Sequence, residues 1–129
     1  MSDDVGARGV FQVAQRAVDL DRAQEFYSWL LGAEPTGRFD PPGLLFFQVG
    51  PTRLLLERGA PSALIYLQVD DVRKTVERCV AHGVDVESEP HVIFRHEDAS
   101  LGPAGTEEWM AFVTDSEGNT VGLVSHTRG

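Results

Sequence analysis

The chain has 129 residues, of which 42% are hydrophobic and 24% charged, as in an ordinary globular domain that buries a core without disulfides. Its formal net charge of −9 and its scattered Lys and Arg residues argue against binding to a nucleic-acid backbone, which needs clustered basic side chains. No apolar run approaches the roughly 20 residues that span a bilayer, so no membrane partner is expected.

The cellular compartment is predicted from two features of the sequence. Cys79 is the single cysteine, which excludes an internal disulfide and gives no sign of an oxidising compartment. The polar segment from Met1 to Gly9 does not resemble a signal peptide. A cytoplasmic location is therefore expected.

The first predicted helix runs from Leu20 to Leu31, where apolar residues recur at helical spacing. Asp19 precedes it as a typical N-cap, because its carboxylate can accept a hydrogen bond from an unpaired backbone N–H of the first turn. Gly32 follows as a typical C-terminal stop.

A second strand-to-helix segment repeats this pattern. Ile65 to Val72 matches Val13 to Leu20, and the offset from Asp19 to Asp71 is 52 residues. The second helix is predicted from Val72 to His82 and ends at Gly83. Two helices with the same start and stop signals indicate an internal duplication.

Strand-like stretches follow each helix. The predicted strands are Leu44 to Val49, Arg53 to Glu57, Val84 to Glu87, His91 to His96, Glu108 to Thr114 and Thr120 to Ser125. Turn residues at Gly50-Pro51 and from Asp115 to Asn119 separate neighbouring strands. The segment from Glu97 to Gly105 is rich in small residues and predicts a loop over a site.

This order of elements, β-α-β-β-β twice, predicts the α+β class. One domain spanning residues 1–129 would contain module one at about 10–57, a linker at 58–62 and module two at about 63–126. Each helix would cover one face of its sheet. The opposite faces would form a curved mixed-sheet cup.

Two stretches of sequence carry a resemblance to a known family. Phe11 to Tyr27, completed by Leu31-Gly32, is similar to the first strand and helix of the vicinal-oxygen-chelate superfamily, which includes glyoxalases, bleomycin resistance proteins and extradiol dioxygenases. Phe112 to Asn119 resembles that family's Asp-Pro-Asp-Gly-Asn turn before the last strand. The resemblance covers about Val10 to Ser125 and implies a fold more firmly than an activity.

The resemblance also implies four metal-ligand positions, where metal-dependent members carry His, Gln or Glu. In this chain they fall on Gln12, Leu54, Leu64 and Gly122. Leu and Gly offer no donor atom, and a slip of one residue brings in no ligand either. No metal cofactor is therefore expected.

One divalent ion at a non-standard site is the alternative. The candidate ligands for it are His91, His96, His126, Glu57 and Glu108. Scattered His and Glu residues are more often surface or pocket-rim groups.

Strand alternation predicts which side chains line the cup, because every second residue of a strand shares a face. The predicted ligand-binding residues are Gln12, Ala14, Leu54, Leu56, Leu64, Tyr66, Gln68, Met110, Phe112, Gly122, Val124 and His126. This apolar lining with a few polar groups suits a partly apolar small molecule. Ordinary core packing is the alternative for Met110 and Phe112.

Two residues are candidates for catalysis. His91 could act as an acid or base near neutral pH, and Glu108 could do so with a pKa raised by an apolar surrounding. A strand cap for His91 and a rim position for Glu108 are the alternatives.

Three functions are weighed on these grounds. The first is sequestration of a small-molecule ligand without a metal, as in the bleomycin-resistance branch that the chain resembles. The second is a lyase, isomerase or epimerase that uses acid–base residues or a relocated metal. Dioxygenase chemistry needs two His and one carboxylate, which the four implied positions do not supply. The resemblance further implies a homodimer.

Overall fold

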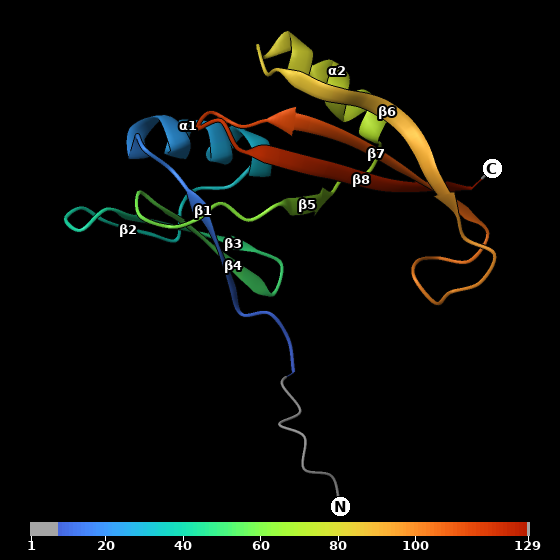
Figure 1. Ribbon diagram of the computed structural model, residues 1–129, viewed down its shortest axis with the longest axis horizontal. Coiled ribbons are helices and arrows are strands. Elements are labelled where there is room, and N and C mark those ends of the chain that lie inside the picture. Colours follow the sequence, from blue (N-terminus) through green and yellow to red (C-terminus); the bar gives the residue numbers. More distant parts are fainter. Residues whose placement is uncertain (1–7, 129) are drawn as a thin grey trace, which may run out of the picture. The chain divides into compact units, whose positions relative to one another are not determined.

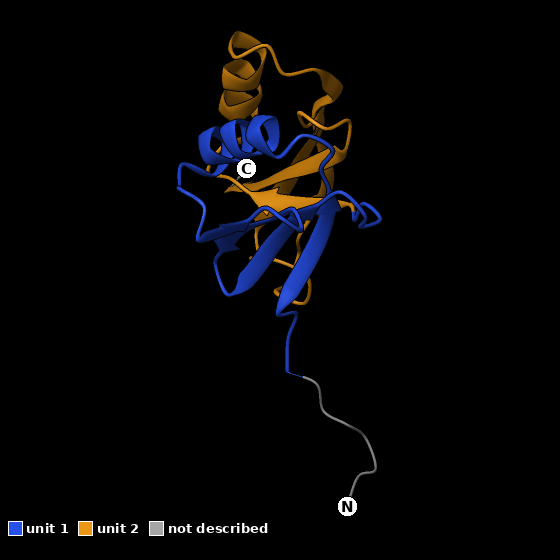
Figure 2. Ribbon diagram, turned by 90° about the vertical axis from the view of Figure 1, so that its left-hand side faces the viewer, with its two compact units in different colours: residues 1–63 blue, residues 64–129 orange. Residues whose placement is uncertain are grey.

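The computed structural model describes residues 8–128 and consists of two compact units, residues 1–63 and 64–129 (Figures 1 and 2). Each unit contains a four-stranded mixed sheet and one helix, which confirms the predicted α+β class. Residues 1–7, most of the segment considered as a signal peptide, lie outside the described part. Neither described helix is long and apolar enough to cross a membrane.

The first unit follows the predicted order of elements. It comprises β1 (Gln12–Arg16), α1 (Leu20–Leu31), β2 (Gly37–Phe39), β3 (Leu44–Val49) and β4 (Thr52–Glu57). The strand order is β1-β4-β3-β2, with β1 parallel to β4. Both caps of α1 are confirmed, because the Asp19 carboxylate accepts from the backbone N–H of Arg22 and Gly32 adopts φ 63°. The three-residue β2 was not predicted, because it is too short to show alternation.

The register of the first sheet corrects part of the predicted ligand face. Gln12 pairs with Arg53 and Ala14 pairs with Leu55, so these side chains share one face. Leu54 and Leu56 point to the other face and are 1% and 0% exposed. That face also carries Phe47, whose ring lies against Tyr27 of α1. Leu54 and Leu56 therefore belong to the core beneath α1. The prediction that Leu54 shares the face of Gln12 is wrong by one residue of register.

The second unit carries the residues on which the site depends. It comprises β5 (Ile65–Gln68), α2 (Val72–Ala81), β6 (Val86–Arg95), β7 (Thr106–Thr114) and β8 (Thr120–Arg128). The strand order is β5-β8-β7-β6. β6 is one continuous strand where two were predicted, and register shifts interrupt its pairing on both sides of Pro90. An edge strand tolerates a proline and such irregularities, because half of its backbone groups need no partner in the sheet.

The two faces of the second sheet differ in character. One face packs against α2, where Ser125 accepts the backbone N–H of Val72 at 3.0 Å and Arg73 lies 4.5 Å from the centre of the Trp109 ring. Ala111 and Leu123, on this same face, are fully buried. The opposite face, called the open face below, contains Tyr66, Gln68, Glu108, Met110, Phe112, Gly122, Val124 and His126. The register thus confirms that these eight residues share a face.

The turn between β7 and β8 sets this register. Asp115 accepts the backbone N–H groups of Glu117 and Asn119 at 2.8 and 2.7 Å, and its second oxygen accepts the Asn119 amide at 2.9 Å. Thr114 then pairs with Thr120. The turn that the segment from Phe112 to Asn119 predicts before the last strand is therefore present.

Asp115→Ala removes both acceptor oxygens and the three hydrogen bonds that they accept, so it should lower the free energy of unfolding by about 1–3 kcal/mol. Urea unfolding followed by circular dichroism measures the change. Asp115→Asn, which keeps one carbonyl oxygen for the backbone N–H groups, should lose less. A loss below about 0.5 kcal/mol for Asp115→Ala, the range of an ordinary surface substitution, would contradict this account of the turn.

Candidate functional site

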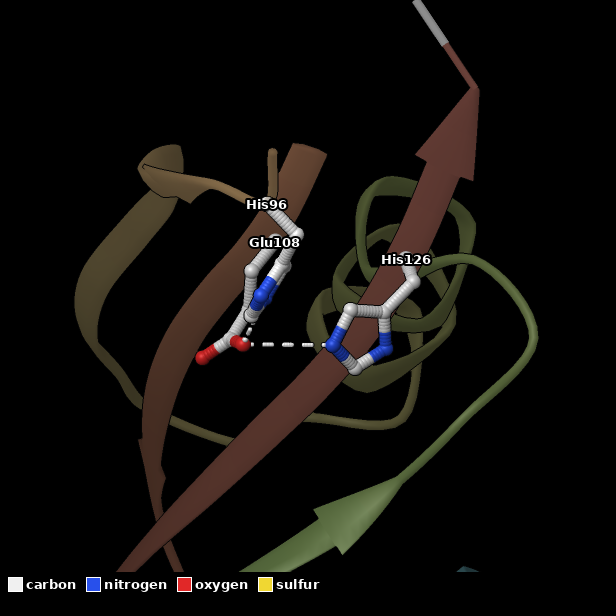
Figure 3. A group of neighbouring side chains, drawn as sticks. All are labelled: His96, Glu108 and His126. Carbon is white, nitrogen blue, oxygen red and sulfur yellow. Dashed lines mark hydrogen bonds and ion pairs between the residues drawn. The ribbon is translucent and has the colours of Figure 1, made fainter. Parts of the chain in front are cut away.

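Two histidines and one glutamate meet at one end of the open face (Figure 3). The Glu108 Oε1 atom lies 2.8 Å from His96 Nε2 and 3.2 Å from His126 Nε2. The ligand atoms of the three side chains all lie within 4.8 Å of one another. The side chain of His96 is 2% exposed, whereas Glu108 and His126 are 16% and 20% exposed. One edge of this cluster is therefore buried and the other is accessible.

Glu108 and His126 are brought together by the β7–β8 pairing. They are direct cross-strand partners, six residues before and six residues after the pair Thr114–Thr120. Side chains of direct partners on one face lie about 4.5–5.5 Å apart at their Cβ atoms. Backbone pairing alone thus places the carboxylate against the imidazole.

His96 reaches Glu108 through the hairpin that joins β6 and β7. Its backbone N–H donates to Thr106 and its carbonyl accepts from Gly105, both at 2.8 Å. The loop between these residues folds back onto the ring, since a Cβ atom added to Gly102 would lie 2.7 Å from His96 Cε1. Close approach of the Gly102 backbone accounts for the burial of His96. The loop predicted to lie over a site thus covers one member of the cluster.

His91 and Glu57, two other candidates, lie outside the cluster. His91 pairs with Met110, a residue of the open face. His91 is exposed, and its Nδ1 atom is 2.8 Å from the carbonyl oxygen of Glu89 on its own strand. The histidine beside Glu108 is therefore His96, which the sequence had singled out only as a metal-ligand candidate. Glu57 belongs to the first unit. A catalytic role for His91 stays a prediction.

An aromatic pair occupies the middle of the open face. The rings of Tyr66 and Phe112 meet edge to face with their centres 5.8 Å apart. Tyr66 lies so close over Gly122 that a Cβ atom there would come within 2.6 Å of Tyr66 Cδ2. Only a glycine leaves room for the tyrosine ring in this position. A ligating side chain at residue 122 would therefore have to displace Tyr66.

A pocket of about 330 Å³ adjoins the cluster. It is lined by Gln68, Val69, Asp70, Pro103, Thr106 and His126. His126 thus belongs to both the pocket and the cluster. The volume lies near the lower end of the range for small-molecule sites.

Two other groups have shifted pKa values. Hydrogen bonds from Ser100 lower the pKa of Asp98, which lies in the loop over His96. Burial raises the pKa of the Cys79 thiol, although Arg78 opposes the effect. A buried thiol with a raised pKa is a poor nucleophile, so the fully buried position of Cys79 on α2 indicates a packing role.

In the first unit, Gln12 already has a cationic partner. Its Oε1 atom accepts a hydrogen bond of 2.6 Å from Arg53. The Arg53 guanidinium lies 4.9 Å from the centres of both the Phe11 and the Phe46 rings. The next residue of β4 on the face of Gln12, after Arg53, is Leu55, which offers no donor atom. A divalent cation beside Gln12 would thus meet a positive charge.

The comparisons with known proteins agree with this architecture. A family model described as "Glyoxalase/Bleomycin resistance protein/Dioxygenase superfamily" matches residues 9–123. No curated protein sequence matches the chain.

Solved structures with the same fold include a lactoylglutathione lyase from Agrobacterium tumefaciens. It has a TM-score of 0.70 and 23% identity over 93% of this chain and 95% of that one. A glyoxalase/bleomycin resistance protein/dioxygenase from Alicyclobacillus acidocaldarius has a TM-score of 0.63 and 18% identity over 92% of each chain. The trypanothione-dependent glyoxalase I of Leishmania major has a TM-score of 0.63 and 26% identity over 92% of this chain and 87% of that one.

The contact between Tyr66 and Gly122 is testable by a double-mutant cycle. Gly122→Ala should lower the free energy of unfolding by roughly 1 kcal/mol, because the added methyl group forces the tyrosine ring to move. In a Tyr66→Ala background the same change should cost much less. Thermal and urea unfolding of the four proteins measure the coupling. An equal cost in both backgrounds would show that Tyr66 does not pack on Gly122.

Proposed function

Because the chain belongs to the Glyoxalase/Bleomycin resistance protein/Dioxygenase superfamily, we propose that it binds a partly apolar small molecule on its open face, without a metal at the family's usual positions. The composition of this face carries the proposal. Tyr66, Phe112, Met110 and Val124 supply apolar surface. The pocket at its end supplies polar groups that can orient a ligand.

Three observations support the absence of the usual metal. Leu54, Leu64 and Gly122 carry no donor atom at the positions where the resemblance places the family's ligands, and Leu55, which shares the face of Gln12, carries none either. The oxygen of Gln12 is engaged by Arg53. The Tyr66 ring fills the space over Gly122. A single neutral amide oxygen does not hold a divalent ion against water, so these four positions favour binding by contact and hydrogen bonding.

The residues that contact this ligand are proposed from geometry. Tyr66 is half exposed and presents both a ring and a hydroxyl group, and Gln68 can donate and accept. The other proposed contacts are Met110, Phe112, Val124 and His126. Gln12, Ala14 and Leu64 remain proposed contacts from the predicted cup, whereas Leu54 and Leu56 are withdrawn from that set as core residues.

A second candidate function is acid–base conversion of the ligand, as in a lyase, isomerase or epimerase. The hydrogen bonds that Glu108 accepts from His96 and His126 favour it. A carboxylate that shares one oxygen with two imidazoles can orient the rings and stabilise a proton on either of them. His126 also borders the pocket, within reach of a bound molecule.

A cytoplasmic homodimer completes the proposal. The buried position of Cys79 is compatible with either redox compartment, so location rests on the sequence argument alone. Val92, Ile93 and Phe94 are 40–48% exposed on the edge strand β6. Apolar side chains on an unpaired sheet edge favour association.

Ligand binding can be tested with two probes, 1-naphthol and 1-naphthoate, followed by amide chemical shifts. We expect saturable shifts in β5, β7 and β8 and a several-fold weaker affinity for Tyr66→Ala, because stacking and apolar contact are lost. Val80→Ala is the matched control, since Val80 is an exposed apolar residue on α2. Shifts confined to other elements, or probe affinities that Tyr66→Ala leaves unchanged, would contradict the proposed face.

The second candidate can be tested by hydrogen exchange at carbon. S-lactoylglutathione, the compound in the name of the A. tumefaciens relative, is incubated with the protein in D₂O and its C2 proton signal is followed by NMR. Acid–base catalysis predicts faster loss of this signal than in buffer, with about a 100-fold reduction for Glu108→Gln. Val80→Ala, at an exposed residue of α2, should keep the wild-type rate. Exchange that survives Glu108→Gln would exclude this carboxylate as the base.

A further inference from the structure

We propose that His96, Glu108 and His126 form a binding site for one divalent transition-metal ion, at a place different from the family's usual one. The three side chains offer two imidazole nitrogens and a carboxylate oxygen within 4.8 Å of one another. Two His and one carboxylate form a common three-residue ligand set that leaves open coordination positions. The inference deepens the proposed function, because it places an ion at the end of the proposed ligand face.

The two distances from Glu108 are close to what such an ion requires. Ligands about 2.0–2.1 Å from a tetrahedral zinc ion lie roughly 3.3 Å from one another. The two measured distances from Glu108 are 2.8 and 3.2 Å. The Glu108 oxygen would move outward by a few tenths of an ångström. Because the ligand atoms of the cluster are spread over up to 4.8 Å, the partly exposed His126 ring would also turn toward His96.

The cluster is held in place before any ion binds. Glu108 and His126 are fixed by the strand pairing, and His96 is fixed by its two backbone hydrogen bonds to the ends of the loop. Gly102 packs against the His96 ring. Rigid supporting contacts of this kind lower the cost of ordering the ligands when an ion binds.

Charge and exposure also favour a cation. With neutral imidazoles the cluster carries the single negative charge of Glu108, and Asp70 lines the adjoining pocket. The exposed edge of His126 borders this pocket, so open coordination positions would face it. Imidazole nitrogens select Zn, Ni, Fe or Cu over Mg or Ca, which prefer oxygen ligands.

This place is separate from the usual metal position. The last-strand ligand of the family falls on Gly122, whereas His126 lies four residues farther along β8 on the same face. Four residues of strand span about 13 Å. The family's position is covered by Tyr66, and the proposed one lies beyond it at the end of the strand.

Tag-free protein, stripped with a chelator, is titrated with Zn²⁺ and with Co²⁺ by calorimetry. We expect one ion per chain, with affinity reduced more than about 100-fold by His126→Ala and by Glu108→Gln, since losing an inner ligand costs at least as much as losing a group that only supports one. His91→Ala, which removes an exposed histidine outside the cluster, should bind like the wild type. X-ray absorption of the zinc form should show nitrogen and oxygen neighbours at about 2.0–2.2 Å and no sulfur.

Thermal unfolding of each metal-free variant separates a lost ligand from a lost fold. His126 is partly exposed, so His126→Ala should keep the wild-type midpoint without metal and lose the upward shift that Zn²⁺ produces in the wild type. Absence of binding for both ions, or binding that His126→Ala leaves unchanged, would overturn the proposal. Tyr66→Ala should leave the Zn²⁺ affinity unchanged, which separates failure of the metal site from failure of the ligand face.

Discussion

The pairing of β7 with β8 is the constraint on which the candidate site depends. Asp115 closes the turn, Thr114 meets Thr120, and every later cross-strand pair follows from that start. The same register places Phe112 opposite Gly122 and Glu108 opposite His126. A slip of one residue would turn these side chains toward α2 and bring Ala111 and Trp109 to the open face. The aromatic middle and the polar end of the face therefore have one common cause.

Much of this arrangement was present in the sequence. The sequence predicts the turn from Asp115 to Asn119, and counting seven residues outward from its ends already pairs Glu108 with His126. The loop from Glu97 to Gly105 allows the same kind of counting. One residue outward from each of its ends, His96 faces Thr106, which is two residues from Glu108. Hairpin symmetry could have revealed the cluster, whereas His91 was a catalytic candidate only for the acid–base chemistry of a histidine near neutral pH.

Other features could not be obtained from pattern. The irregular pairing of β6 places His91 opposite Met110. A regular strand counted back from the hairpin would not give it this partner. The face of Leu54 and Leu56 depends on which residue of β4 meets Gln12, and a run of three leucines gives no alternation to decide it. The contact of Tyr66 with Gly122 joins residues far apart in the chain, and the glycine itself is its only sign in the sequence. Sequence patterns predict elements better than they predict the partners of single side chains.

The glycine at position 122 and the histidine at position 126 are linked by geometry. Both lie on the same face of β8, and the ring of Tyr66 covers the first while the second remains accessible. A carboxylate at residue 122 would compete with the Tyr66 ring for the same space. This face can therefore carry either a metal-coordinating side chain at residue 122 or an aromatic surface. With the aromatic surface in place, the donor atoms of the second unit that remain grouped are those of His96, Glu108 and His126 among the residues described. The apolar middle of the face would then hold the body of a ligand, and the polar end would meet its oxygen atoms. A face divided in this way would orient a partly apolar molecule along β8 under either of the two proposed functions.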